Sequence, residues 1–175
     1  FTSCCPAWVK FCETRYPQLK EHISTCRSPQ EMFGAVLKEE ARINEEKERA
    51  EGREPKKTLV VSIMPGTAKK AEIERPEHYT DGVKNVDYVL TTTEITRMIQ
   101  EAGIDLSQVQ PEALDMPFGL ASGAGAIFGV TGGVMEAALR SAYYFAEGKN
   151  PGPDDFSVVR GEKGIREVTV TIAGR

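Results

Sequence analysis

Two adjacent cysteines, Cys4 and Cys5, stand directly before Pro6 near the start of the sequence. Neighbouring residues strain the geometry of a disulfide, so we expect two reduced thiols here. Proline suits the first turn of a helix, which places both cysteines at a helix N-terminus. The partial positive charge of that end favours thiolates, which bind metals and exchange protons. Taken alone, the pair also fits a packing role, because cysteine is often buried as a small apolar residue.

Two further segments carry residue types that suit a binding site. The first is Met64-Pro65-Gly66-Thr67-Ala68-Lys69-Lys70-Ala71-Glu72, which follows an apolar run over residues 58–64. Such a run predicts a buried, parallel strand, and ligands of open α/β sheets bind beyond the carboxyl ends of the strands. The second is the glycine- and alanine-rich stretch over residues 118–140. Its small side chains let the backbone approach a ligand closely.

Together with Thr2-Ser3-Cys4-Cys5-Pro6-Ala7-Trp8, these segments resemble the H-cluster domain of the iron-only (di-iron) hydrogenase family. The first motif of that family reads TSCCP-x-W, and the second reads MPC-x-x-K-x-x-E. This sequence has Gly66 where the second motif has its cysteine, and it lacks the third motif, which supplies two further cysteines. The resemblance covers nearly all of the chain but only the middle of the family's domain. We therefore expect a fragment, with a single domain over residues 1–175.

The resemblance implies a role for several residues of the first two motifs. Cys5 corresponds to a ligand of the 4Fe-4S cubane, and Cys4 corresponds to the thiol that exchanges protons with the di-iron subcluster. Lys69 corresponds to a lysine that donates a hydrogen bond to a cyanide ligand of the di-iron unit. Glu72 corresponds to a carboxylate that pairs within the site. The alternatives are a surface lysine for Lys69 and a solvated glutamate at a helix start for Glu72.

Five other positions also correspond to family residues. Met64 and Pro65 match residues that line the cofactor pocket. Phe128 and Gly129 fall in the segment that closes over the di-iron cofactor. Ser24 matches a serine in the path along which protons reach the surface, a task that suits a hydroxyl because it both donates and accepts. A cap or turn role for Ser24 is the alternative.

Gly66 leaves one corner of a cubane without its family ligand, because glycine has no donor atom and cubanes normally need four thiolates. The remaining cysteines are Cys12 and Cys26. Cys12 lies two helical turns after Cys5, roughly 10 Å along the helix axis, so core packing suits it better. For the glycine-rich stretch, a phosphate-binding loop competes with the cofactor role. Neither Walker A nor G-x-G-x-x-G occurs there in its strand-to-helix context.

The overall composition restricts the partners. A net charge of −4 argues against a nucleic-acid partner, which usually requires a concentrated basic patch. No apolar run approaches the roughly 20 residues of a membrane helix, and the N-terminus lacks the pattern of a signal peptide. We therefore expect a cytoplasmic protein that binds neither nucleic acid nor membrane. His22 and His78 are single and unclustered, so both are expected to be structural or surface residues.

Local patterns predict the elements that position these residues. Helices are expected from Pro6, from Pro29 after a Ser28 cap, from Thr92 or Thr93 to residue 104, and from Gly132 after a Thr131 cap. Strands are expected over residues 58–64 and 86–90, with an antiparallel pair over 156–160 and 167–173. The charged run over about 38–57 predicts a solvated helix end and then a loop. The expected fold class is α/β: short, mostly parallel strands flanked by helices, with a C-terminal antiparallel strand pair, as a fragment of the two-lobed hydrogenase catalytic domain.

The resemblance implies reversible proton reduction and hydrogen oxidation at a di-iron centre linked to an iron-sulfur cubane. The implied partners are the rest of the hydrogenase polypeptide or its subunits, and an electron carrier such as ferredoxin or an NAD(P)-linked subunit. Because ligands are missing, we expect the isolated chain to be inactive, and exposed apolar surface favours self-association. The alternatives are a catalytically silent structural or partner-binding relative of the H-cluster domain and, less strongly, a nucleotide-binding module.

Overall fold

The computed structural model describes residues 1–161 and 164–174. The chain divides into two compact units, Phe1–Gln110 and Pro111–Arg175, and each unit is described by itself. The assignment of residues 1–175 to a single domain stays a prediction.

The first unit begins with three helical segments. They are α1 (Pro6–Arg15), the 3-10 helix η1 (Pro17–His22) and α2 (Pro29–Ala50). Both predicted helix starts are confirmed, since proline occupies the first turn of α1 and of α2. The Ser28 hydroxyl caps α2 by accepting a hydrogen bond from the Glu31 amide at 3.4 Å. Proline and the cap residue fix these starts locally, before any tertiary contact is made.

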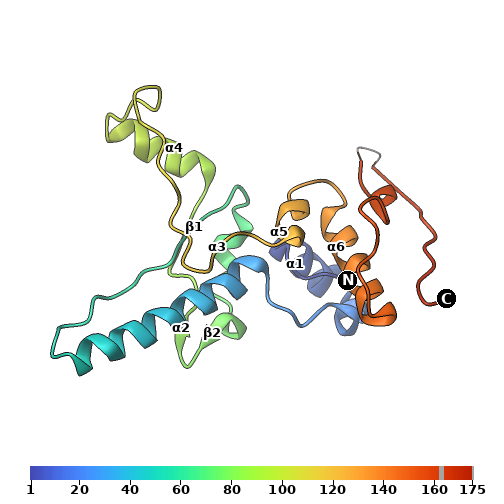
Figure 1. Cartoon of the computed structure of the whole chain (residues 1–175). Coiled ribbons are helices and arrows are strands. Elements are labelled where there is room, and N and C mark those ends of the chain that lie inside the picture. Colours follow the sequence, from blue (N-terminus) through green and yellow to red (C-terminus); the bar gives the residue numbers. More distant parts are fainter. Residues whose placement is uncertain (162–163, 175) are drawn as a thin grey trace. The chain divides into compact units, whose positions relative to one another are not determined.

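Helix α2 continues well into the charged run (Figure 1). Arg42 pairs with Glu39 and Glu46 at (i, i+3) and (i, i+4) spacing along its exposed face, and such pairs support a helix. The prediction of a loop is therefore wrong over residues 38–50 and holds only beyond the end of the helix. The chain then returns along α2, where the Lys38 ammonium donates to the Thr58 carbonyl at 3.2 Å.

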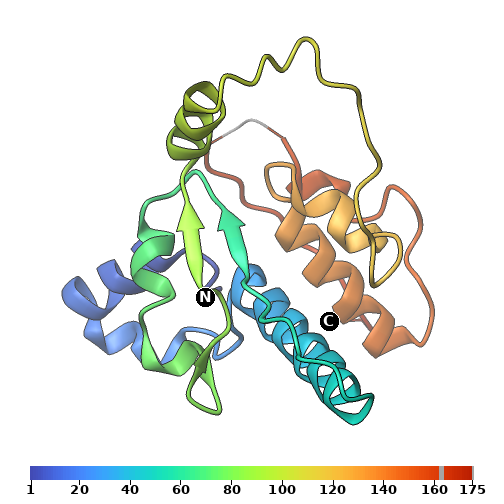
Figure 2. The same cartoon turned by 90° about the vertical axis from the view of Figure 1, so that its left-hand side faces the viewer.

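Two short sheets follow. Strand β1 (Val61–Ile63) pairs in parallel with β4 (Tyr88–Leu90), in the register Val61 to Tyr88 and Ile63 to Leu90 (Figure 2). This confirms the prediction of strands in both apolar runs and of a parallel arrangement. The prediction that the first strand is buried is wrong, because Val61 and Ile63 are exposed. Strands β2 (Tyr79–Thr80) and β3 (Val83–Lys84) form an antiparallel hairpin between them.

A small apolar core lies behind β1 and β4. Its buried members are Val60, Ile73, Val86 and Val89, with Leu37 and Met64 packed against them. The core joins α2 to the sheet and to α3 (Ala68–Glu72), the helix that carries Lys69. A 3-10 helix, η2 (Pro76–His78), leads from α3 into the hairpin.

Asp87 connects α2 to the sheet by polar contacts. Its Oδ2 accepts a hydrogen bond from the Val60 amide at 2.7 Å. The same oxygen forms an ion pair with the Lys38 ammonium group at 2.5 Å. Close packing at Gly34 of α2 completes this junction, because a Cβ there would lie 2.7 Å from the Asn85 carbonyl oxygen. Glycine is thus required where the helix passes the strand.

Helix α4 (Thr92–Glu101) starts at Thr92, one of the two predicted positions. Its cap is Thr91, and a capping box joins Thr91 to Glu94 in both directions. The helix ends three residues before the predicted position 104. The Glu94 carboxylate accepts a hydrogen bond from the Thr91 amide, and Lys70 lies nearby. Together they lower the pKa of Glu94 to about 2.

The second unit contains α5 (Gly123–Phe128), α6 (Gly133–Glu147) and the 3-10 helix η3 (Ser157–Val159). Ser122 caps α5 by accepting from the Gly125 amide at 3.2 Å. The α6 helix is capped by Gly132, not by Thr131 as predicted. Gly148 ends α6 in the left-handed conformation, which glycine adopts readily.

The predicted C-terminal antiparallel pair is wrong. Residues 157–159 form η3, and residues 164–174 contain no strand; residues 162–163 lie outside the described part of the chain. The Arg166 side chain donates to the Val158 carbonyl at 3.0 Å, so it uses an acceptor that a partner strand would need. The antiparallel strands of this α/β fold are instead those of the β2–β3 hairpin.

Ion pairs fix the chain after α6. Glu136 is fully buried, with Oε1 at 3.0 Å from Arg140 Nε and Oε2 at 2.5 Å from Arg160 Nε. Arg140 also donates to the Gly152 carbonyl at 3.0 Å. The buried carboxylate thereby ties the segment after the helix back onto α6.

Candidate functional site

The two adjacent cysteines lie at the start of α1, as predicted. Cys5 is the residue that caps the helix, and both thiols are exposed. The preceding Ser3 hydroxyl donates to the Cys26 carbonyl at 2.6 Å, and the Cys26 amide donates to the Ser24 hydroxyl at 3.2 Å. The segment that carries the cysteines is therefore held by the loop before α2.

Ser24 takes part in this structural contact. Its hydroxyl accepts from Cys26, and its amide donates to the Phe1 carbonyl at 2.8 Å. The turn role that the sequence left open is thus present. The same side chain lines the cleft described below, so the proton-path role of Ser24 stays a prediction.

The second motif occupies the carboxyl end of β1, as the strand pattern predicted. Met64 continues the ladder, since its amide donates to the Leu90 carbonyl at 2.9 Å. Pro65 and Gly66 are exposed at the turn that follows, and the chain then enters α3. Met64 is partly buried against the core, and its role and that of Pro65 in a cofactor pocket stay predictions.

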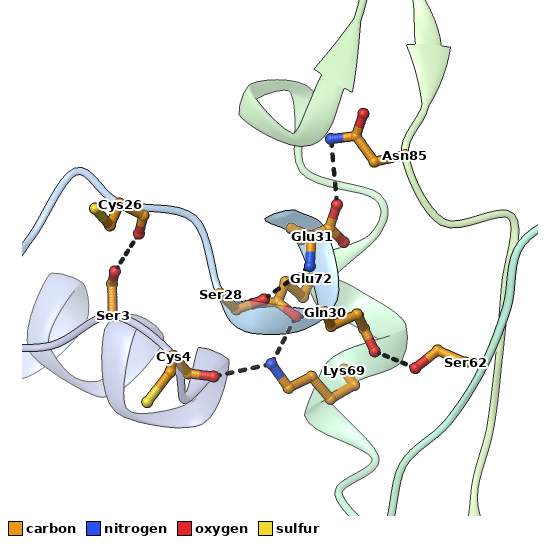
Figure 3. A network of polar contacts seen from close by, with 10 residues as sticks. All are labelled: Ser3, Cys4, Cys26, Ser28, Gln30, Glu31, Ser62, Lys69, Glu72 and Asn85. Atoms are coloured by element: carbon orange, nitrogen blue, oxygen red, sulfur yellow. Dashed lines mark hydrogen bonds and ion pairs between the residues drawn. The ribbon is translucent and has the colours of Figure 1, made fainter. Parts of the chain in front are cut away.

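Lys69 joins the two motifs. Its ammonium group lies 2.8 Å from the main-chain oxygen of Cys4 and 2.9 Å from Glu72 Oε2 (Figure 3). The Lys69 side chain is 15% exposed and that of Glu72 only 3%, so the pair is largely shielded from water. The alternatives of a surface lysine and a solvated glutamate are therefore wrong in this structure.

Gln30, in the first turn of α2, also binds Glu72. Its amide nitrogen donates to Glu72 Oε2 at 3.1 Å, and its oxygen accepts from the Ser62 hydroxyl of β1 at 2.7 Å (Figure 3). From the sequence, this turn was predicted only as a helix start. No local signal indicates that Ser28, Gln30 and Glu31 are buried, because polar side chains in a helix start are usually solvated.

A cleft of about 360 Å³ opens beside this network. Ser24, Cys26 and Glu72 line it, together with charged residues. Among these, Arg75 holds Glu13 at 2.7 Å, and its hydrogen bond lowers the pKa of the Glu13 carboxyl group. The cleft therefore contains charged groups of both signs, and the catalytic candidates Ser24 and Glu72 are among the residues that line it.

Phe128 and Gly129 belong to the second unit, where they end α5. Phe128 is 43% exposed, and Gly129 is the residue that caps the end of the helix. Because each unit is described by itself, a common site with Cys4 and Lys69 stays a prediction for these two residues.

The thiols of this chain do not assemble a cubane site by themselves. Within residues 1–161 and 164–174, no cluster of three or more His, Cys, Asp or Glu side chains is placed to hold a metal ion. Cys12 is fully buried and its thiol lies 3.5 Å from the Tyr16 carbonyl oxygen, which confirms its packing role. Gly66 offers no donor atom, and a Cβ there would meet open space.

No helix in the described part of the chain is both long and apolar enough to cross a membrane.

Known proteins are similar in sequence to this chain over its whole length. Residues 1–175 match the family described as iron-only hydrogenase large subunit, C-terminal domain. The periplasmic [Fe] hydrogenase large subunit of Nitratidesulfovibrio vulgaris is 48% identical over 174 residues, which are 99% of this chain and 40% of that protein. The NADP-reducing hydrogenase subunit HndD of Solidesulfovibrio fructosivorans is 43% identical over 98% of this chain and 28% of its own length.

A solved structure shares the fold as well. The apo form of a variant of the [FeFe]-hydrogenase HydA1 from Chlamydomonas reinhardtii superimposes with a TM-score of 0.64 and 40% identity. The match covers 87% of this chain and 37% of that one. The chain thus spans well under half the length of these similar proteins.

Proposed function

Because the chain belongs to the iron-only hydrogenase large-subunit family, we propose that it forms part of the cluster-binding region of a hydrogenase, an enzyme that reversibly reduces protons and oxidises hydrogen. One observation carries the proposal. The Lys69 ammonium group lies 2.8 Å from the Cys4 carbonyl, so the two motifs on which the family resemblance rests meet at one place.

The proposed roles follow the motif positions. Cys5 would supply one thiolate to a 4Fe-4S cubane, which would pass electrons when bound. Cys4 is the acid/base thiol, and both thiols are exposed as these roles require. Lys69 offers hydrogen-bond donors on the same side as Cys4. Glu72 holds the ammonium group in place through a contact of 2.9 Å.

The remaining predicted residues complete the proposal. Met64 and Pro65, at the carboxyl end of β1, would line the cofactor pocket, and Phe128 and Gly129 of the second unit would cover the di-iron subcluster. Ser24 would pass protons toward the cleft that it lines.

These 175 residues do not fit an intact cluster. A cubane needs four thiolates, whereas Gly66 has no donor atom and Cys12 is buried in the helical core. We therefore expect the isolated chain to be inactive, with the missing ligands supplied by other parts of the hydrogenase polypeptide or by its subunits. The alternative, a catalytically silent structural or partner-binding relative, requires that Cys5 binds no iron.

The partners and the location are part of the same proposal. An electron carrier such as ferredoxin or an NAD(P)-linked subunit would exchange electrons with the complete enzyme. We keep a cytoplasmic location as an expectation, although the relative from Nitratidesulfovibrio vulgaris is named periplasmic. Self-association is expected because Val61 and Ile63 of β1 are about half exposed, at 49% and 55%. A monomer by light scattering at high concentration would contradict that expectation.

The test is iron and acid-labile sulfide per chain after anaerobic reconstitution. Because the ligand set is incomplete, we expect less than one cubane of iron per unaltered chain, no iron in Cys5→Ala, and an unchanged amount in the matched control Cys26→Ser, which alters another exposed thiol. Hydrogen evolution from a reduced dye should be absent in all three proteins. Equal iron with and without the Cys5 thiol would contradict the metal role and favour the silent relative.

A further inference from the structure

Glu31 is a buried carboxyl group to which the hydrogenase resemblance assigns no role. It lies in the first turn of α2 and has no exposed surface. Its Oε2 accepts one long hydrogen bond, from the Asn85 amide at 3.5 Å, and its Oε1 has no hydrogen-bond partner among the described residues (Figure 3). An ionised carboxylate in such a position would be very costly, and groups of this kind usually become neutral instead.

The neighbouring carboxyl group, that of Glu72, is in the opposite situation. It accepts from Lys69 at 2.9 Å and from Gln30 at 3.1 Å, both at Oε2. One ammonium group thus compensates one carboxylate. Glu31 has no ion pair of its own within residues 1–161 and 164–174. The two buried carboxyl groups therefore have one ammonium group between them, and ionisation of both would be costly.

The other charged groups nearby are already engaged. The Arg27 guanidinium, just before α2, donates to the Thr80 hydroxyl at 3.2 Å and to the Tyr79 carbonyl at 3.5 Å. Arg75 pairs with Glu13 and Glu77. None of these cations is in contact with Glu31.

His78, in η2, makes no ion pair with Glu31 among the described residues. Burial lowers the pKa of its imidazole, more than the nearby Glu72 and Glu77 raise it, and its Nδ1 has no partner in the described part of the chain. For Glu31 itself, burial is the largest influence and raises the pKa of the carboxyl group above 4.5. The Glu72 charge raises it further, against weaker opposite effects of Asn85, Gln30 and Arg27.

We propose that Glu31 stays protonated in the folded chain, so that Glu31 and Glu72 together form a site that holds one proton. The neutral Glu31 leaves Lys69 to Glu72 alone, and the same ammonium group keeps its bond to the Cys4 carbonyl. Ionisation of Glu31 would place a second negative charge in the same interior and weaken this arrangement. The proposal concerns the metal-free chain and does not rest on the hydrogenase assignment.

The direct test is NMR titration of the side-chain carboxyl carbons of the metal-free 175-residue chain labelled with ¹³C-glutamate. We expect Glu31, assigned through its backbone, to titrate at higher pH than the other glutamates. The internal reference is exposed Glu39, because the hydrogen bond from Arg42 lowers the pKa of its carboxyl group. A Glu31 signal that titrates together with Glu39 would overturn the proposal.

A second test uses unfolding in urea as a function of pH. The folded state holds the Glu31 proton more tightly than the unfolded chain, so stability is fully present below pH 4.5 and is lost as the pH rises toward the folded pKa. In that interval the unfolding equilibrium constant should rise by up to about tenfold per pH unit because of Glu31. Glu31→Gln should remove this rise, and the surface control Glu39→Gln should keep it. Parallel curves for Glu31→Gln and the unaltered chain would contradict the proposal.

Discussion

Lys69 donates a hydrogen bond to the main-chain oxygen of Cys4, 65 positions earlier in the chain, over 2.8 Å. The contact joins α3, the helix that follows β1, to the segment before α1, and each carries residues of one of the motifs. Because the acceptor is a main-chain atom, Lys69 can fix the path of the cysteine segment while leaving both thiols exposed.

Replacing Lys69 should destabilise the first unit. In Lys69→Met the buried Glu72 carboxylate loses the one ion-pair partner that it has among the described residues, so we expect the free energy of unfolding to fall by about 3 kcal/mol. Urea unfolding measures this loss. Amide hydrogen exchange over residues 4–8 should also accelerate, because the cysteine segment loses its anchor.

Lys70 provides the matched control for that experiment. It is the neighbouring lysine, and its ion pair with Glu94 is 43% and 46% exposed. Lys70→Met should therefore cost at most about 1 kcal/mol, as is usual for surface pairs. Equal losses for the two lysine variants would contradict a special role of Lys69.

Restoring a thiol at position 66 should be tolerated. A Cβ on Gly66 meets no atom within 4 Å, so Gly66→Cys should change the free energy of unfolding by no more than about 0.5 kcal/mol. On reconstitution, this variant should bind more iron per chain than the unaltered protein, because it adds a thiolate at the family's ligand position. Gly66→Ser has a similar size without the thiolate and should bind no additional iron.

Gly34 provides the contrast, because a side chain there would not be tolerated as it is at position 66. A Cβ at Gly34 would lie 2.7 Å from the Asn85 carbonyl oxygen and 2.8 Å from Val86 Cγ2. Gly34→Cys should therefore cost about 1–3 kcal/mol in the same urea assay. A Gly66→Cys variant as unstable as Gly34→Cys would show that the turn after β1 is closed to a side chain.

Asp87 should contribute to the fall in the free energy of unfolding at acid pH. Burial raises the pKa of its carboxyl group, but the hydrogen bonds from Lys38 and the Val60 amide and the Lys38 charge outweigh burial, and the net pKa lies below 3.8. The contribution of Asp87 is therefore fully present above about pH 4 and is lost as the pH falls toward the folded pKa. Asp87→Asn should reduce stability at neutral pH by about 2 kcal/mol.

The measurement is urea unfolding between neutral pH and pH 2. The stability of Asp87→Asn should fall less with acid than that of the unaltered chain, and the exposed control Asp81→Asn should follow the unaltered chain. If Asp87→Asn shows the same acid dependence as the unaltered chain, the Lys38 pair does not set the pKa of Asp87.

Local signals accounted for much of the fold. The starts of α1 and α2 follow from Pro6, Ser28 and Pro29, which act on their own turns. The parallel pairing follows from two apolar runs. The cap of α4 was missed among three consecutive threonines, although the spacing to Glu94 singles out Thr91 as the start of a capping box.

Other features could not be derived in this way. The charge of residues 38–57 suggested a loop, but the (i, i+3) and (i, i+4) spacing of the Arg42 ion pairs supports a longer α2. The missing C-terminal pair depends on the Arg166 contact with Val158, a tertiary feature. Gln30 and Glu31 meet partners 42 and 54 positions away, so no local pattern could reveal that they are buried.

The bond between Lys69 and Cys4 also sets an order in time. A ribosome adds roughly 5–20 residues per second, so the 65 positions between the two residues take roughly 3–13 s to synthesise. During that interval the cysteines have already been made while their anchor has not. The cysteine segment can therefore take its final path only after the second motif has been synthesised.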